Sequence, residues 1–577
     1  MNARRYSTAR MSLCVWALLS YWNAWGQASP QRVDSIKARL ASIRHFADKL
    51  PSNKKKLLSV GAQNVIQTAK EFSGMDEELR ELQMRLNSSS AAAVPQDGRS
   101  AATGNSPIPV SRRADDFIFS QVGGFSQSET TTSWCGSNVV VGFNDSGSVL
   151  ETLLGSGGLS FNGYARSING GDSFTDLGYL NPGPKFFDFL SGDPVIACTS
   201  GNVFYYASLF ETGTPQAPRS AISVSRSTDG GLTFGDPVVA ASKDGDTHFL
   251  DKEWLAVDPT NPSRIFVTYT DFDTSLNFCG TDNNAFPIPR VAIELVRSTN
   301  GGATWSVPRV MEELCSPLTV PGDLVQGSQV AVGPAGRVYV AWEHFDADFI
   351  TRDIRIRASS NHGGSFDPVT VVTDVVCVGD CFELQGGFRD FIDLNSLIID
   401  RSGKSTNGNV YIAWQDGRNL RVFDLASQSG SYSYSDVLVI RSTNRGANWS
   451  APVKVNGNKE PLPSGKGTDQ YQPGIAVDKD GHLGACFYDR RRDPENWFIE
   501  RVCAKSDNAG ETWTNDIVEH TSFAPYHATD IFLNLLYMGD YDMLSSDFTL
   551  THPGFVGAFQ VISRRGDPNV VATKFIP

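Results

Sequence analysis

The sequence predicts an all-β propeller built from four-stranded antiparallel blades, with seven blades preferred and six as the alternative. Three observations support this fold class. Aromatic residues make up 11% of the 577 residues and glycine occurs 53 times, which is typical of many short strands joined by tight turns. One eight-residue motif occurs six times, at intervals of 60 to 83 residues. Runs of alternating or continuous apolar residues precede the copies of this motif, as expected for strands.

The first 28 residues are predicted to be a signal peptide. Arg4, Arg5 and Arg10 precede a largely apolar run at 11–25, and Gly26-Gln27-Ala28 offers a small-residue cleavage site. This run is shorter than the about 20 residues that a membrane span needs, and no later run is long enough. We therefore expect a secreted or periplasmic protein with no membrane span.

Residues 30–90 are predicted to form a short helical segment ahead of the propeller. Val33, Ile36, Leu40 and Ile43 recur at intervals of three and four, which is the spacing of an amphipathic helix. We expect a helical hairpin that packs on the main domain or on itself. Residues 91–114, rich in Ser, Ala, Gly and Pro, are predicted to be a flexible linker, and the propeller is expected from 115 to 577.

Eight of the nine cysteines lie beyond the signal peptide, an even number in a chain that is expected to reach an oxidising compartment. Three candidate pairs are suggested by their positions in the predicted repeats or by a short loop between them: Cys486 with Cys503, Cys135 with Cys198, and Cys377 with Cys381. The connectivity stays open at this point. The CVGDC loop lacks a second pair of ligands at zinc spacing, so we predict disulfides and no metal or cofactor.

The six motifs share the pattern S-x-[DN]-x-G-x-[TSN]-[WF] and begin at Ser167, Ser227, Ser298, Ser359, Ser442 and Ser506. The Ser and Asp or Asn side chains bind nearby backbone, the glycine accepts a positive φ, and the aromatic residue packs against a neighbouring strand. Because the motif recurs in nearly every repeat while an active site is unique, we expect it to be structural.

Each motif is predicted to be the turn between the third and fourth strands of a blade. In the third repeat, WLAVD at 254–258 and IFVTYTD at 265–271 are the first two strands. A strand at 116–121 is expected to complete the last blade and close the ring. Because the 2–3 and 4–1 loops lie on the face opposite the motif turns, binding residues are expected there, among them Lys252, Glu253 and Asp540.

These motifs resemble the Asp-boxes, or bacterial neuraminidase repeats, of the sialidase-like β-propellers, and the resemblance covers residues 115–577. It implies a secreted glycoside hydrolase that acts on sialylated or other acidic glycans. A non-catalytic propeller that binds glycan or protein is the alternative. The preferred count of seven blades departs from the six of true sialidases.

The resemblance also implies a set of site residues. Tyr541 in GDYDML stands where the family has its nucleophile, and Asp393 or Asp469 stands for the partner carboxylate. The family holds the substrate carboxylate with three arginines, which here correspond to Arg418 and Arg490, with Arg389 in a Phe-Arg pair as the third. The early Phe-Arg-Ile-Pro motif of the family is absent from the first repeat. Two guanidinium groups near Tyr541 are expected to lower the pKa of its phenol.

The formal charge of −13 argues against nucleic acid or anionic lipid as a general partner. The sequence contains no phosphate-binding glycine loop, no G-x-S-x-G motif and no H-E-x-x-H motif. A carbohydrate or glycoconjugate is the ligand that the resemblance implies, and the oligomeric state is not predicted.

Overall fold

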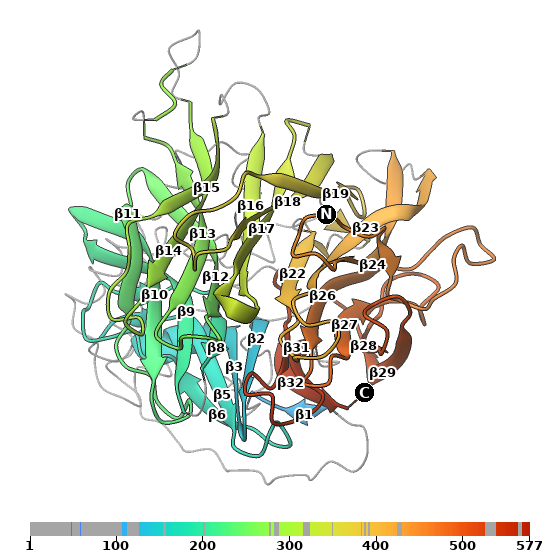
Figure 1. Ribbon diagram of the computed structural model, residues 1–577, viewed down its shortest axis with the longest axis horizontal. Coiled ribbons are helices and arrows are strands. Elements are labelled where there is room, and N and C mark those ends of the chain that lie inside the picture. Colours follow the sequence, from blue (N-terminus) through green and yellow to red (C-terminus); the bar gives the residue numbers. More distant parts are fainter. Residues whose placement is uncertain are drawn as a thin grey trace, which may run out of the picture.

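The repeated strands form a ring of seven four-stranded antiparallel sheets around a central axis (Figure 1). This computed structural model describes residues 107–111 and 126–576, together with Asp48 and Leu58. The gaps lie at 154–156, 200–201, 276–277, 282–287, 316–322, 349, 382, 386–387, 390–392, 424–429, 526–537 and 563–567. The seven-blade prediction is confirmed, and the six-blade alternative is wrong.

The first three blades follow one another along the chain. Blade 1 consists of β2 (Gln127–Cys135), β3 (Asn138–Asp145), β5 (Asn162–Ser167) and β6 (Thr175–Tyr179). Blade 2 consists of β8 (Val195–Cys198), β9 (Phe204–Thr214), β10 (Ala217–Ser227) and β11 (Val238–Asp244), with the short strands β4 (Leu159–Ser160) and β7 (Phe189–Leu190) added beside β9. Blade 3 consists of β12 (His248–Val257), β13 (Ile265–Asp273), β14 (Arg290–Ser298) and β15 (Arg309–Cys315). Helix α6 (Ser146–Leu153) occupies the 2–3 loop of blade 1.

The next three blades repeat the same order. Blade 4 consists of β16 (Leu324–Val332), β17 (Val338–Phe345), β18 (Thr351–Ser359) and β19 (Thr370–Val376), with the 3-10 turn η1 (Pro334–Gly336) between its first two strands. Blade 5 consists of β22 (Leu394–Ile399), β23 (Val410–Phe423), β24 (Ser431–Ser442) and β25 (Val453–Lys454), and is preceded by the hairpin of β20 (Glu383–Leu384) and β21 (Phe388–Arg389). Blade 6 consists of β26 (Gln470–Val477), β27 (Leu483–Asp489), β28 (Ile499–Ser506) and β29 (Thr514–Phe523).

Blade 7 combines both ends of the propeller. Its strands are β30 (Leu544–Ser546), β31 (Phe555–Ile562), β32 (Pro568–Phe575) and β1 (Ile108–Pro109), and β1 pairs antiparallel with β32. The closing strand therefore lies at 108–109, within the predicted linker, instead of at 116–121, which is outside the described residues. In Figure 1 the colours pass round the ring until red β32 lies beside blue β1.

The first strands of the blades surround the axis. Each first strand contacts the first strands of the neighbouring blades, and β2 contacts β30 to complete the circle. Hydrophobic clusters fill the space between adjacent sheets, for example between blades 4 and 5 and between blades 5 and 6. Leu58, from the predicted helical segment, is fully buried in the cluster that also contains Val149 of α6. The rest of that segment lies outside the described residues, apart from Asp48.

The six repeated turns, which we call the clamp turns, are hydrogen-bonded alike. In the turn that begins at Ser298, the hydroxyl donates to Asn300 Oδ1 and accepts from the N–H of Gly302, both at 2.9 Å. Asn300 Oδ1 also accepts from the N–H of Thr304 at 3.0 Å. The same three bonds recur in the other five turns. The structural interpretation of the motif is confirmed.

Arginines that precede the motif serine tie some clamp turns to the next blade. Arg297 Nη1 donates to the carbonyl of His362 in the next turn at 2.8 Å, and Arg441 Nη1 donates to the carbonyl of Ala509 at 2.9 Å. The turns therefore lie at one end of the ring, as the strand order predicts.

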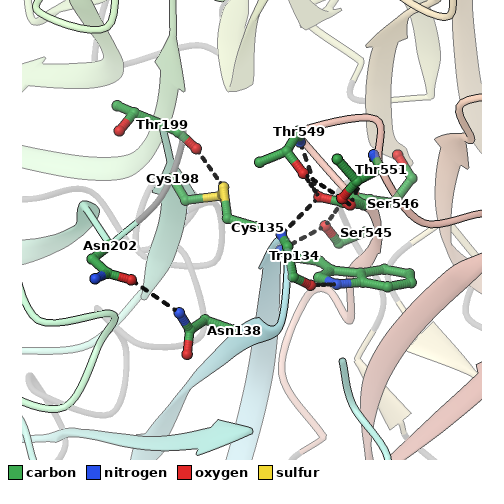
Figure 2. Close-up of a disulfide and its surroundings, with 12 residues drawn as sticks. Trp134, Cys135, Asn138, Cys198, Thr199, Asn202, Ser545, Ser546, Thr549 and Thr551 are labelled. Carbon is green, nitrogen blue, oxygen red and sulfur yellow. Dashed lines mark hydrogen bonds between the residues drawn. A yellow bond between two sulfur atoms is a disulfide. The ribbon is translucent and has the colours of Figure 1, made fainter. Parts of the chain in front are cut away.

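Four disulfides are present among the described residues. Cys135–Cys198, Cys377–Cys381 and Cys486–Cys503 are the pairs that sequence position suggests, and Cys279–Cys315 is the fourth. Cys135 and Cys198 end the first strands of blades 1 and 2, so their bond joins two blades near the axis (Figure 2).

Candidate functional site

Tyr541 lies next to the axis at the end of the ring opposite the clamp turns. It precedes β30, and its side chain reaches across to blades 2 and 3, where the hydroxyl donates to the carbonyl of Pro194 at 3.0 Å. The ring packs edge-on against Trp254, and the ammonium of Lys252 lies 4.1 Å from its centre. Tyr541 is only 3% exposed, so its side chain is covered by these neighbours.

The environment of Tyr541 raises the pKa of its phenol well above the ordinary value. Burial is the main cause, and the carboxylates of Glu129, Asp193 and Glu253 add to it. The expected lowering of this pKa by two guanidinium groups is therefore wrong. The phenol is neutral at physiological pH and already donates its proton to a backbone carbonyl.

Arg490 and Asp469 are brought together, but inside blade 6. Arg490 Nη1 lies 3.5 Å from Asp469 Oδ2, and both side chains are fully buried. Asp469 Oδ2 also accepts from the Tyr432 hydroxyl and from Asn496 Nδ2, each at 2.6 Å. Burial raises the pKa of Asp469, although the Arg490 guanidinium lowers it.

The remaining predicted residues lie in other contacts. Asp393 forms an ion pair with Arg352, and its backbone N–H donates to Glu343 Oε2 at 2.8 Å. Arg418 binds Asp416, with Nε to Oδ1 at 2.7 Å, and its side chain is 25% exposed. Only the backbone of Arg389 is described, in β21.

The five predicted residues whose side chains are described do not converge on one group. Tyr541 contacts blades 2 and 3, Asp469 with Arg490 forms a pair in blade 6, and Asp393 and Arg418 bind partners of their own. The described link between them is indirect. Gln415 Nε2 donates to Asp393 Oδ1 at 3.3 Å, and Gln472 donates its N–H to Gln415 Oε1 and its Nε2 to the carbonyl of Gly539.

A different set of residues surrounds Tyr541, and we call it the axial acid cluster: Glu129, Asp193, Lys252, Glu253 and Asp540. Each of these residues is 7% exposed or less. They come from blades 1, 2, 3, 3 and 7, so the ring closure brings together positions up to 411 residues apart. Four carboxyl groups and one ammonium group therefore meet at the axis.

Backbone bulges place these side chains. The register of β2 against β3 shifts between Ser128 and Thr131, and that of β12 against β13 shifts between Asp251 and Trp254. Positive φ values occur at or just before the first strands of blades 1, 2 and 3, namely 52° at Glu129, 53° at Asp193 and 55° at Lys252. Such bulges redirect side chains that would otherwise alternate along a strand. Here they aim polar groups at the axis.

Hydrogen bonds hold one side of the cluster. Glu129 Oε2 accepts from Asn144 Nδ2 at 2.6 Å, and its Oε1 accepts from the N–H of Asp540 at 2.9 Å. Lys252 Nζ donates to Asp540 Oδ2 at 3.3 Å. Burial alone would lower the pKa of Lys252, but the carboxylates of Asp540 and Glu129 hold it above its ordinary value.

Glu253 differs from its neighbours. It is 1% exposed, and neither of its carboxyl oxygens has a hydrogen-bond partner among the described residues. Burial, followed by the charge of Asp193, raises its pKa well above the ordinary value. A carboxyl whose pKa is raised by burial keeps its proton to a higher pH than usual and can act as a general acid. Trp254, the next residue, is half-buried beside Tyr541.

Sequence reasoning placed Lys252, Glu253 and Asp540 on this face but missed Glu129 and Asp193. A signal was available, because both are charged residues at the start of the first strand of a repeat. An alignment of the repeats on their first strands would have placed Glu129 and Asp193 in about the same position as Lys252.

One group of potential metal ligands occurs among the described residues. Asp323, His344 and Asp346 present ligand atoms within 4.8 Å of one another. His344 Nδ1 lies closer to Asp353 Oδ2, at 3.0 Å, and the side chain of Asp346 is half exposed. We assign no metal to this rim group.

No family model and no curated protein matches the chain. Among solved structures, an ulvan lyase bound to a polysaccharide fragment matches with a TM-score of 0.44 and 10% identity, over 79% of this chain and 95% of the lyase. An α-L-arabinofuranosidase from Fusarium graminearum in complex with an iminosugar inhibitor matches with a TM-score of 0.40 and 10% identity, over 67% and 97%. The intramolecular trans-sialidase from Ruminococcus gnavus matches with a TM-score of 0.34 and 12% identity, over 66% and 94%.

The blade topology and the clamp turns confirm the predicted fold class, a β-propeller of four-stranded blades. Within the described part of the chain, no helix has the length and apolar character of a membrane span.

Proposed function

We propose that this protein is an exported enzyme that hydrolyses a glycosidic bond, with Glu253 as the general acid. The observation that carries the proposal is the environment of this carboxyl group, which is buried, has no hydrogen-bond partner among the described residues and lies beside an ion pair. Glycoside hydrolysis needs one carboxylic acid to protonate the leaving oxygen and a second, ionised carboxylate. Asp540, which accepts from the Lys252 ammonium, supplies the second carboxylate.

The half-buried indole of Trp254 supports a sugar ligand at this place. It follows Glu253 directly and packs edge-on against Tyr541, and an indole is a side chain on which a sugar ring can stack. The excess of carboxyl groups in the cluster favours an uncharged sugar, because an anionic sugar would meet Glu129, Asp193 and Asp540. Export is supported by the four disulfides, which persist in oxidising compartments.

The test is a screen of the full chain on fluorogenic neutral glycosides, with sialosides and glucuronides as the acidic set. We expect turnover of a neutral glycoside that falls as the pH rises through the pKa of Glu253, because the acid loses its proton. Glu253→Gln should lower kcat by roughly 100-fold or more while leaving ligand binding in place. Glu511→Gln is the matched control, since Glu511 lies in a clamp turn at the opposite end with a side chain that is 60% exposed.

The other outcomes separate the alternatives. Full activity of Glu253→Gln would refute its role as the acid. Loss of turnover in Tyr541→Phe, with Glu253→Gln still active, would favour the nucleophile that the family resemblance implies. Cleavage of sialosides alone would favour the acidic glycans expected from the sequence. Binding of a glycan without cleavage of any would favour the non-catalytic propeller.

A further inference from the structure

A cavity lies on the axis, at the clamp-turn end of the ring. Its volume is about 230 Å³, and every blade contributes the last residues of its first strand to the wall. The wall combines aliphatic residues of the first strands with polar groups, among them Thr132, Ser133, Ser545 and Ser546. We call it the axial cavity. It is separate from the axial acid cluster, none of whose residues lines it.

Arg401 is the only cation among the described residues that line this cavity. It follows β22 directly, and its guanidinium lies 4.1 Å from the ring centre of Phe548. Within the described chain it forms no ion pair and no hydrogen bond. Arg401 therefore presents an uncommitted guanidinium at a wall of mixed aliphatic and polar groups.

The nearest carboxylates already have other donors. Asp400 Oδ1 accepts from the N–H of Ser402 at 2.7 Å. Asp547 accepts from the N–H of Gly136 at 2.9 Å and from the side chain of His552 at 2.8 Å. Both attract Arg401, but neither comes within ion-pair distance. Burial lowers the pKa of Arg401 to about 10, so it stays charged at neutral pH.

Blade 7 contributes the turn between its first two strands to the wall of the cavity, next to Arg401. The turn between β30 and β31 carries Phe548, whose N–H donates to the carbonyl of Trp134 at 2.8 Å. The Phe548 ring packs against the hydrophobic clusters of blades 1 to 4 and lies beneath Arg401. Figure 2 shows this turn, with Ser545 and Thr549 beside Trp134. A ligand in the cavity would thus be held between the aliphatic residues of the wall and this turn.

We propose that the axial cavity binds a medium-chain aliphatic carboxylate, with its carboxylate on Arg401 and its chain along the aliphatic residues of the wall. An apolar chain gains by leaving water, and a planar guanidinium matches a carboxylate with two parallel hydrogen bonds. The volume corresponds to roughly eight water molecules at about 30 Å³ each, which suits a ligand of about ten non-hydrogen atoms such as octanoate.

The test is calorimetric titration of the full chain with butanoate, hexanoate, octanoate and dodecanoate. Affinity should rise about fourfold with each methylene until the cavity is full near eight carbons, and then stop rising. Octanol has the aliphatic chain without the carboxylate, and acetate has the carboxylate without the chain. Both should bind at least tenfold more weakly than octanoate.

Variants assign the binding to Arg401. Arg401→Gln should weaken octanoate binding at least tenfold, whereas Arg309→Gln, an exposed arginine on β15, should leave it unchanged. If Arg401→Gln does not fold, Arg401→Lys keeps the charge without the paired donors and should bind octanoate more weakly than the wild type. No binding of octanoate, equal binding of octanol, or unchanged binding in the Arg401 variants would overturn the proposal.

Discussion

Removing the disulfide between Cys135 and Cys198 is expected to destabilise the protein more than removing any other of the four described disulfides. The bond joins the first strands of blades 1 and 2 at the axis and spans a sequence separation of 63 residues. Cys377 and Cys381 are separated by only four residues. A crosslink stabilises chiefly by restricting the unfolded chain, so the longer loop should matter more.

The loop lengths give the expected size of the effect. The loop-closure relation gives about 4.3 kcal/mol at 25 °C for a separation of 63, and about 2 kcal/mol for a separation of 4. Cys279–Cys315 and Cys486–Cys503, with separations of 36 and 17, should fall between them. Cys135, Cys198, Cys377 and Cys381 are all buried, so the cost of lost packing is similar in the two extreme cases.

Urea unfolding of the paired Cys→Ala variants, followed by tryptophan fluorescence, measures these differences. The Cys135/Cys198 variant should lose about 2 kcal/mol more than the Cys377/Cys381 variant. Its free energy of unfolding should also depend more steeply on urea concentration, because the unfolded chain without the long-loop crosslink exposes more surface. An equal or larger loss in the Cys377/Cys381 variant would show that loop closure in the unfolded chain does not govern the stability of this ring.

Two further predictions concern single residues. Trp449→Ala in a clamp turn should lower the free energy of unfolding by about 2–4 kcal/mol, because the half-buried indole packs on the cluster between blades 4 and 5. This is somewhat less than the loss expected for a fully buried tryptophan. Thermal unfolding measures the loss, and Val307→Ala, at a side chain that is 84% exposed, is the control. Burial raises the pKa of Asp145 from 3.8 to about 6, so its contribution to stability is present below about pH 4 and lost as the pH rises through about 6. Relative to Asp145→Asn, the wild type should therefore lose up to about 3 kcal/mol between pH 4 and 7, and parallel melting temperatures across that range would contradict the assignment.

The blade pattern could be predicted from the sequence because it repeats. Six motifs in the same register fix the turn between third and fourth strands. Similar places in successive repeats suggest the pair Cys135–Cys198, and positions on two successive strands suggest Cys486–Cys503. The closing strand could not be predicted this way. Ile108 and Pro109 form only a two-residue strand, and its pairing with Val571 and Ala572 depends on the geometry of the closed ring.

The candidate site was harder to predict, because the position of a residue in its blade does not determine which groups its side chain contacts. Arg490 ends a second strand, as expected for a ligand-binding arginine, but it turns inward to Asp469 and the carbonyl of Asn496. The axial acid cluster depends on bulges at Glu129 and Lys252, which alternation of apolar and polar residues does not reveal. Only the arrangement of seven first strands around one axis makes these residues neighbours.

Because β1 and β32 lie at opposite ends of the propeller sequence, the order of synthesis determines when the ring can close. Translation at about 5–20 residues per second makes Ile108 wait about 20–90 s before its partner strand exists. During that interval blades 1 to 6 accumulate with an open sheet edge at each end of the array, and open edges invite pairing with other chains. An export route that keeps the chain extended until Phe575 has been made would let all seven blades assemble together. Protein made in a compartment where the early blades fold at once should aggregate more.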